Sequence, residues 1–223
     1  MKSAQFALLF DLDGTLADSD PLHYRAFARL LEENGKTLTP ELYQRHVVGG
    51  FNAGIMRALF PELSAERRQQ MADHKEALFR ASVGEMEPIA GARRLFDWAA
   101  AQGAAIAVVT NAPRANAELM LDKLALRSRV DALIVGDELE HAKPHPLPYL
   151  TALKRLGASA GRACAFEDSP SGIRAARAAG VHTFGIASDL DPACLEEAGT
   201  AAVLADFHAP ALWEWLERQT ASV

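Results

Sequence analysis

Short runs of apolar residues recur along the chain and predict β-strands. They cover residues 6–10, 104–109, 132–135, 163–166, 181–186 and, more weakly, 201–204. Apolar residues fill these runs almost continuously instead of alternating with polar ones. This pattern is typical of strands that are buried on both faces, as in a parallel sheet.

Between these runs, apolar residues return every three or four positions and predict amphipathic helices. The helices are expected at residues 92–102, 113–124, 146–156, 171–179 and 209–217. We expect the last of them to be a terminal helix that covers the sheet. Strands and helices that alternate in this way predict an α/β fold with a doubly wound, Rossmann-like parallel sheet.

One interval, residues 18–86, contains helical patterns and no convincing strand. Its first helix is predicted from one apolar face, formed by Leu22, Ala26, Phe27, Leu30 and Leu31. A second helix is predicted at residues 65–81, and "GGFNAG", residues 49–54, is interpreted as a turn between helices. We therefore expect an inserted helical cap domain at 18–86 and an α/β core domain made of 1–17 and 87–223.

Composition and charge narrow the classes of protein. Of 223 residues, 49% are hydrophobic and 23% charged, as in ordinary globular proteins. The net charge of −6 and the lack of a basic run argue against a nucleic-acid partner, and no apolar run is long enough to span a membrane. Cys164 and Cys194, with no CxxC pair, favour a reducing, cytoplasmic location. We expect a monomer.

Polar side chains follow several of the predicted strands. They are, in chain order, Asp11, Asp13, Thr110, Asn111, Lys143, Glu167 and Asp168. Open α/β sheets bind ligands at the carboxyl ends of their strands, so these groups are expected to converge. Clustered carboxylates are stable beside a hard cation such as Mg²⁺, which also binds substrate phosphate. A carboxylate nucleophile, a lysine and Mg²⁺ together predict phosphoryl transfer.

Simpler interpretations exist for each of these groups. Asp11 and Asp13 are also compatible with a solvated turn, and Thr110 and Asn111 with the cap of the next helix. Lys143 is compatible with an exposed loop lysine. Glu167 and Asp168 are compatible with a favourable position beside a helix dipole, and Ser169 and Pro170 with the N-cap and first residue of that helix.

Four motifs in order resemble a known family. "DLDGT", "VVTN", "KPHP" and "FEDSPSGI" are similar, in sequence and spacing, to the four signatures of the haloacid dehalogenase (HAD) superfamily. The resemblance spans nearly the whole chain and is closest to the β-phosphoglucomutases and small sugar-phosphate phosphatases. It implies that Asp11 is the nucleophile and a Mg²⁺ ligand. It also implies that Asp13 is the general acid and base, with its backbone carbonyl on the metal.

The resemblance implies roles for the remaining groups as well. Thr110 and Asn111 would hold the transferring phosphoryl group, and Lys143 would pair with Asp11 and the phosphoryl oxygens. Asp168, together with Glu167, would complete the Mg²⁺ site.

Three residues of the predicted cap domain are candidates for binding the rest of the substrate. His23, Lys75 and Asn52 occupy positions similar to substrate-contacting positions of the mutase branch. The alternatives are a half-exposed helix histidine for His23 and a solvated helix lysine for Lys75. "GGFNAG", which contains Asn52, is compatible with a specificity loop or with a simple turn.

These residues favour a Mg²⁺-dependent phosphatase that acts on a small phosphorylated metabolite, such as a sugar or polyol phosphate. The alternative is a β-phosphoglucomutase-type mutase. That alternative is weaker because mutases carry an arginine where this chain has Asn52, although Arg57 lies nearby. A true dehalogenase conflicts with Asp13 and Asp168, and a phosphonate-cleaving enzyme with the lack of a lysine in "HVVGGFNAG". A non-catalytic, ligand-binding relative is a third hypothesis.

Overall fold

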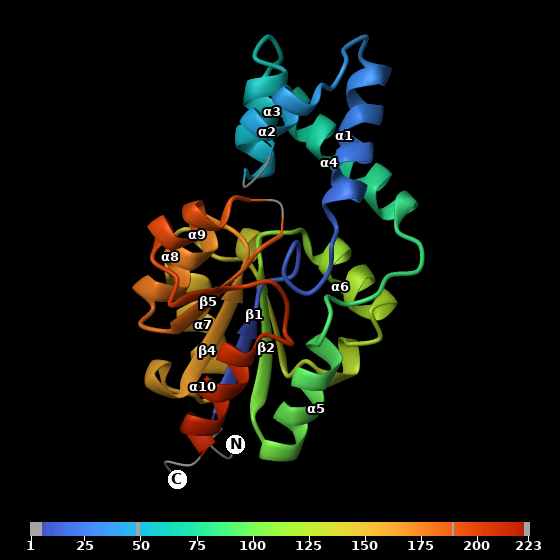
Figure 1. Ribbon diagram of the computed structural model, residues 1–223. Coiled ribbons are helices and arrows are strands. Elements are labelled where there is room, and N and C mark those ends of the chain that lie inside the picture. The colour runs from blue at the N-terminus through green and yellow to red at the C-terminus, as the bar shows by residue number, and fades with distance from the viewer. Residues whose placement is uncertain (1–5, 48–49, 189, 221–223) are drawn as a thin grey trace. The chain divides into compact units, whose positions relative to one another are not determined.

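The chain folds into two compact units in a computed structural model that describes residues 6–47, 50–188 and 190–220 (Figure 1). One unit comprises Met1–Asp18 and Met86–Val223 and is called the core below. The other comprises Ser19–Glu85 and is called the insert. Among the described residues, no helix combines the length and apolar character needed to cross a membrane.

The core is built on a six-stranded sheet in the order β3-β2-β1-β4-β5-β6. The strands are β1 (Ala7–Phe10), β2 (Ala105–Thr110), β3 (Ala132–Val135), β4 (Ala163–Glu167), β5 (His182–Ile186) and β6 (Ala202–Leu204). All neighbouring strands pair in parallel. In the central strand β1, all four side chains are buried. This confirms the parallel sheet that the continuous apolar runs predict.

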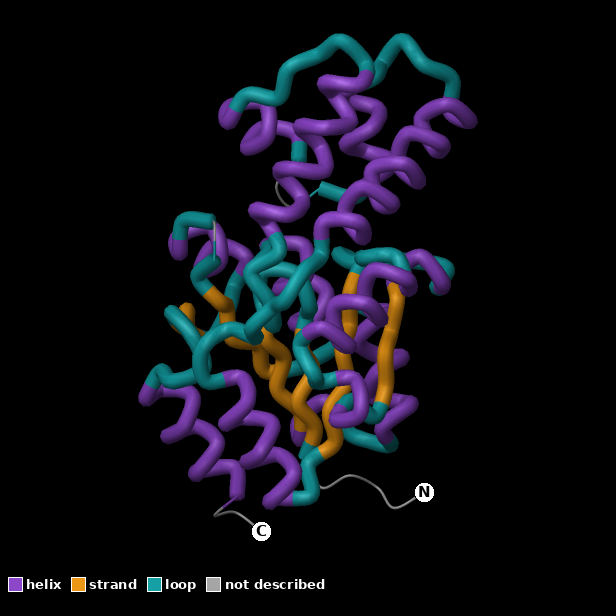
Figure 2. Tube along the Cα trace, turned by 90° about the vertical axis from the view of Figure 1, so that its right-hand side faces the viewer, coloured by secondary structure: helices purple, strands orange, loops and turns teal. Residues whose placement is uncertain are grey.

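Helices cover both faces of this sheet (Figure 2). They are α5 (Ala92–Gln102), α6 (Arg114–Lys123), α7 (Leu147–Leu156), α8 (Pro170–Ala178), α9 (Pro192–Ala198) and α10 (Pro210–Thr220). Leu9 points to the face where α7 and α8 contribute buried side chains. Phe10 points to the opposite face, where its ring packs against Phe96 of α5. The structure therefore has the predicted doubly wound arrangement, and adds α9, which the sequence pattern does not predict.

Helix α10 covers the sheet through aromatic contacts. The indole of Trp215 stacks on the His182 ring, with centroids 4.6 Å apart, and meets the edge of Phe184. Leu212 and Leu216 on the same helix are fully buried. The prediction of a terminal amphipathic helix is therefore confirmed.

In the described part of the insert there are four helices, α1 (Asp20–Glu33), α2 (Pro40–His46), α3 (Asn52–Leu59) and α4 (Ala65–Ser82). They enclose a hydrophobic core of their own. The apolar face predicted for the first helix is buried at every one of its five positions.

The turn predicted at residues 49–54 is partly wrong. Helix α3 already begins at Asn52, and Gly49 lies outside the described residues. The Gly54 and Ile55 amides both donate to the Phe51 carbonyl, and Ile55 and Met56 are buried. Glycine is commonly a turn residue, but these hydrogen bonds and this burial stabilise helix at Gly54.

Candidate active site

The predicted polar groups meet at the switch point of the sheet. Strands β2 and β3 lie on one side of β1, and β4, β5 and β6 lie on the other. In such sheets the crevice outside the carboxyl ends at this point is the usual ligand site. Asp11 directly follows β1, and Glu167 is the last residue of the neighbouring strand β4. The Asp11 amide donates to the Phe166 carbonyl over 2.9 Å, which ties the two strand ends together.

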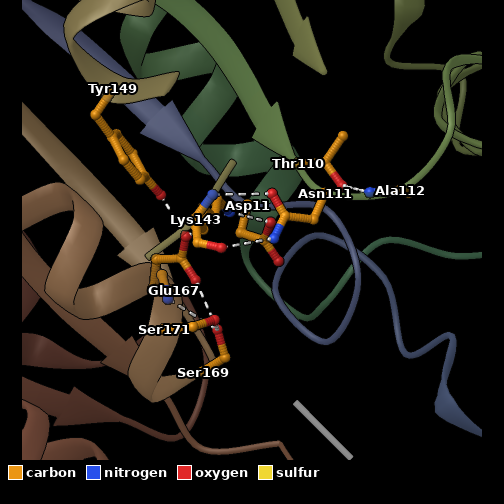
Figure 3. A network of polar contacts seen from close by, with 10 residues as sticks. Asp11, Thr110, Asn111, Ala112, Lys143, Tyr149, Glu167, Ser169 and Ser171 are labelled. Atoms are coloured by element: carbon orange, nitrogen blue, oxygen red, sulfur yellow. Dashed lines mark hydrogen bonds and ion pairs between the residues drawn. The ribbon is translucent and has the colours of Figure 1, made fainter. Parts of the chain in front are cut away.

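Lys143 bridges these two carboxylates (Figure 3). Its Nζ lies 2.5 Å from Asp11 Oδ1 and 2.6 Å from Glu167 Oε1. All three side chains are buried, and charges in such surroundings are stable only when they are paired. Burial alone would lower the pKa of Lys143, but the charges of Asp11 and Glu167 outweigh it and raise the pKa. Lys143 is therefore a permanent cation, and the alternative of an exposed loop lysine is wrong.

The Asp11 carboxyl group has a strongly perturbed pKa. Burial is the largest cause and raises the pKa to about 7, assisted by the charges of Glu167 and Asp13, while Lys143 acts in the opposite direction. Asp11 is thus poised between its neutral and ionised forms near neutral pH. Perturbed carboxyl groups of this kind are concentrated at functional sites.

Three carboxylates form a group with the chemistry of a metal site. Asp11, Glu167 and Asp168 each offer an oxygen, and the three oxygens lie within 4.8 Å of one another. Such a cluster of hard oxygen donors fits a divalent cation such as Mg²⁺. The Asp168 Oδ2 atom also accepts a hydrogen bond of 3.2 Å from Ser188. Asp13 is partly exposed, and its charge contributes to the pKa of Asp11, so it belongs to the same cluster.

The loop after β1 passes very close to this cluster at Gly14. Gly14 has a φ of +68°, and a Cβ there would lie 2.1 Å from Asp168 Oδ2. Glycine is therefore required at this position for two reasons. The backbone is left-handed, and a side chain would collide with the Asp168 carboxylate.

Thr110 is the last residue of β2, and Asn111 directly follows it. The Thr110 Oγ1 atom accepts a hydrogen bond of 2.9 Å from the Ala112 amide. The Asn111 side chain accepts from the Lys143 amide over 3.3 Å and donates to the Lys143 carbonyl over 3.4 Å. Asn111 thus ties the end of β2 to the lysine loop. Neither residue caps α6, which has Pro113 at its N-cap position, so that alternative is wrong.

Ser169 caps α8 and contacts the site at the same time. Its Oγ accepts from the Gly172 amide over 3.1 Å, as predicted for an N-cap, and Pro170 is the first residue of the helix. The same hydroxyl donates to Glu167 Oε2 over 3.4 Å.

The three candidate residues of the insert form a separate polar cluster. Lys75 Nζ lies 2.8 Å from His23 Nδ1 and 3.0 Å from Glu76 Oε1, and Asn52 donates to the same Glu76 oxygen over 2.7 Å. Burial would raise the pKa of Glu76, but Lys75 and Asn52 outweigh it and lower the pKa. Lys75 is 2% exposed, so the alternative of a solvated lysine is wrong. His23 stacks on Phe79 with ring centroids 4.2 Å apart.

Three residues of these two clusters are not predicted from the sequence: Ser188, Tyr149 and Glu76. Ser188 lies just beyond β5, so the rule that directs attention to carboxyl ends of strands would have identified it. Tyr149 lies within α7, where its only signal is that a buried phenol needs a hydrogen-bond partner. Glu76 is the neighbour of Lys75, and its signal is an acidic residue on the helix face that also carries Phe79.

A doubly wound parallel sheet with a buried lysine and clustered carboxylates at its switch point places the chain among Rossmann-like α/β proteins with an acidic candidate active site. Residues 8–186 match the haloacid dehalogenase-like hydrolases, and the chain belongs to this family. The family inferred from the four motifs and the fold predicted from the alternating strands and helices are both confirmed.

Several proteins similar in sequence are phosphatases. The chain is 31% identical over 204 residues to a phosphorylated carbohydrates phosphatase of Thermotoga maritima, covering 89% of this chain and 93% of the relative. It is 36% identical over 175 residues to a phosphoglycolate phosphatase of Xylella fastidiosa, covering 78% and 76%. The crystal structure of a HAD hydrolase, family IA, variant 3, from Entamoeba histolytica is 26% identical, with a TM-score of 0.87 over 96% of this chain and 99% of that one.

Proposed function

We propose that this HAD-family phosphatase hydrolyses a small sugar or polyol phosphate through a phosphoryl group carried on Asp11. The observation that supports the proposal most strongly is the buried pair of Asp11 and Lys143, 2.5 Å apart, at the switch point of the sheet. A buried carboxylate beside a permanent cation can attack an anionic phosphoryl group, because the cation offsets the charge that builds up.

In the first step, an Asp11 oxygen attacks the substrate phosphorus, and the bond from phosphorus to the ester oxygen breaks. Asp13 donates a proton to the departing oxygen, so the alcohol leaves neutral. Lys143 stays paired with Asp11 and neutralises the phosphoryl oxygens. In the second step, Asp13 takes a proton from a water molecule, which attacks the phosphorus and releases inorganic phosphate and free Asp11.

We assign the binding of Mg²⁺ to the side chains of Asp11, Asp168 and Glu167 and to the backbone carbonyl of Asp13. The three side chains are the oxygen cluster described above, and its donors suit a hard cation. When bound, Mg²⁺ supplies further positive charge against the phosphoryl oxygens.

Thr110 and Asn111 are assigned to the phosphoryl group. The Thr110 oxygen accepts from Ala112, which directs the hydroxyl proton elsewhere, and this proton can be donated to a phosphoryl oxygen. Asn111 acts through the lysine loop, which its side chain holds at two backbone atoms.

The polar cluster of the insert favours a substrate whose leaving group is uncharged. We assign His23, Asn52 and Lys75 to the part of the substrate away from the phosphate. The charge of Lys75 is already neutralised by Glu76, at 3.0 Å, so this cluster presents polar groups without a spare cation. Hydroxyl groups of a sugar or polyol suit such a cluster better than the carboxylate of phosphoglycolate or a second phosphate.

A mutase is the second candidate, and the insert gives it less support. A mutase must bind a bisphosphate, yet Asn52 is an uncharged amide already committed to Glu76. Arg57 is exposed on the next turn of α3 and is a candidate cation for a second phosphate.

The experiment is a phosphate-release assay with Mg²⁺ and a panel of sugar phosphates, polyol phosphates, phosphoglycolate and β-glucose 1-phosphate. Asp11→Asn is expected to abolish release, and Asp122→Asn, an exposed acid on α6, is the matched control that keeps it.

The two unpaired cysteines, Cys164 and Cys194, support a cytoplasmic location for this activity.

Each outcome has a definite meaning. Phosphate release that requires Asp11 and is highest with sugar or polyol phosphates supports the proposal. Conversion of β-glucose 1-phosphate to the 6-phosphate without phosphate release makes the protein a mutase. If no ester reacts and EDTA has no effect, the non-catalytic hypothesis replaces the proposal.

A further inference from the structure

Tyr149 is a fully buried tyrosine whose hydroxyl reaches the proposed active site. It lies in α7, on the sheet face that also carries Leu9 and Ala165. Its hydroxyl donates a short hydrogen bond to Glu167 Oε1 (Figure 3). None of the roles assigned above uses this residue.

The Glu167 carboxylate is held on several sides. Its Oε1 atom receives both the Tyr149 hydroxyl and, at 2.6 Å, the Lys143 ammonium. Its Oε2 atom accepts from Ser169, and the backbone of Gly172 lies so close that a Cβ there would be 1.8 Å away. A carboxylate restrained in this way provides a rigid anchor for its lysine partner.

Lys143 needs such an anchor because a lysine side chain is flexible and its ammonium pairs with two buried carboxylates. Its ammonium must stay 2.5 Å from Asp11 while also balancing Glu167. The Tyr149 hydroxyl donates one of the hydrogen bonds that the buried Glu167 carboxylate needs, and it adds no charge. The Tyr149 ring lies 5.5 Å from Lys143 Nζ and restrains the ammonium from another side.

We propose that Tyr149 is a positioning residue that acts through Glu167 to hold the Lys143 ammonium against Asp11. The inference rests on the proposed function, in which Lys143 offsets the charge of the phosphoryl group. It concerns the step after substrate binding, so it predicts an effect on kcat rather than on KM.

The first test is Tyr149→Phe, which removes the hydroxyl and keeps the ring. We expect kcat for the best phosphate ester to fall about tenfold, as for the loss of a hydrogen bond to a charged group, with KM unchanged. Tyr43→Phe is the matched control, because it removes another tyrosine hydroxyl, in the insert. An unchanged kcat in Tyr149→Phe, or a loss of the same size in Tyr43→Phe, would overturn the proposal.

The second test asks whether Tyr149 acts through Glu167. In a Glu167→Gln background, adding Tyr149→Phe is expected to cost less than twofold in kcat, because the two residues act as one unit. A full additional tenfold loss in that background would show that Tyr149 acts independently of Glu167 and would overturn the proposal.

A third measurement does not depend on activity. The ammonium signal of Lys143 in a ¹H–¹⁵N spectrum is identified by its loss in Lys143→Arg. We expect Tyr149→Phe, but not Tyr43→Phe, to shift or broaden this signal; an unmoved signal contradicts the proposal. If the wild-type protein released no phosphate, the proposed function would fail, whereas this spectrum would still decide the role of Tyr149.

Discussion

At the scale of single residues, the main feature is a buried set of charges that balance one another. Asp11 and Glu167 share one ammonium, and each would be costly to bury alone. Breaking such a set by removing one member leaves an uncompensated charge, which is why Lys143 is expected to tolerate no neutral replacement. The pKa of Asp11 is raised chiefly by burial, with a further contribution from the charges of Glu167 and Asp13, while Lys143 lowers it.

The raised pKa of Asp11 predicts a pH dependence of Mg²⁺ binding. Asp11 has a pKa of about 7, against its ordinary value of 3.8, and must be ionised to bind the cation. The Mg²⁺ dissociation constant is therefore expected to rise as pH falls below about 7, by up to ~tenfold per pH unit. Calorimetric titration from about pH 5.5 to 8 measures this, and the dependence should disappear in Asp11→Asn.

The same pKa sets the sign for stability in the presence of EDTA. Between about pH 4 and 7 the folded protein holds a proton on Asp11 that the unfolded chain has lost. The contribution of Asp11 to the free energy of unfolding therefore falls as pH rises through that window. A Mg²⁺ affinity that did not change with pH in this window would contradict the raised pKa of Asp11, on which both expectations rest.

At the residue scale, the sequence revealed the polar groups that follow strands but not those that reach the site from elsewhere. Asp11 and Glu167 are predictable because parallel strands end at one edge of a sheet, and Lys143 because it belongs to the "KPHP" motif. Tyr149 is not, because its position relative to Glu167 depends on how α7 packs on the sheet. Glu76 is missed for the same reason, since α1, α3 and α4 must pack before it meets His23 and Asn52.

At the scale of elements, apolar runs predicted the strands well but misplaced their ends. Glu167 and Thr110 belong to β4 and β2, where they pair with Gly185 and Val135. A polar residue usually argues for the end of a buried strand, but here sheet pairing extends the strand into the site. Helix α9 was missed because only Leu195 and Ala198 are buried on it, which is too few for a clear period.

The start of α8 yields a prediction at this scale. In Gly172→Ala, the new Cβ would lie 1.8 Å from Glu167 Oε2, so the helix or the carboxylate must move. We expect kcat to fall more than tenfold and stability to fall by about 1–3 kcal/mol. Phosphate release and denaturant unfolding measure the two effects.

Gly161→Ala is the matched control for this change. Gly161 also lies in the core, and a Cβ there meets nothing within 4 Å. If Gly172→Ala kept the wild-type kcat, the close packing of α8 against Glu167 would have no functional consequence.

At the scale of the whole molecule, two units carry two kinds of polar cluster. The core cluster is acidic with one lysine, whereas in the insert cluster one lysine is matched by one acid. We propose that the first performs the chemistry and the second selects the leaving group. The two clusters are therefore expected to respond separately to mutation.

Glu76→Gln tests this division. It removes the partner charge of Lys75 and leaves a cation that favours anionic leaving groups. The ratio of kcat/KM for phosphoglycolate to that for the best sugar phosphate is expected to rise about tenfold. Glu62→Gln, an exposed acid paired with Lys36 in the same unit, is the control, and an unchanged ratio in Glu76→Gln would refute the assignment.

The way the chain leaves and re-enters the core has a consequence for which changes of sequence and length the insert tolerates. β1 pairs directly with β2 although the whole insert lies between them in sequence, and the Ile89 amide donates to the Leu16 carbonyl over 2.9 Å. The exit and re-entry points are therefore fastened to each other within the core. The insert behaves as a cassette: its sequence can be lengthened, shortened or exchanged without unpairing a strand of the sheet that holds the nucleophile.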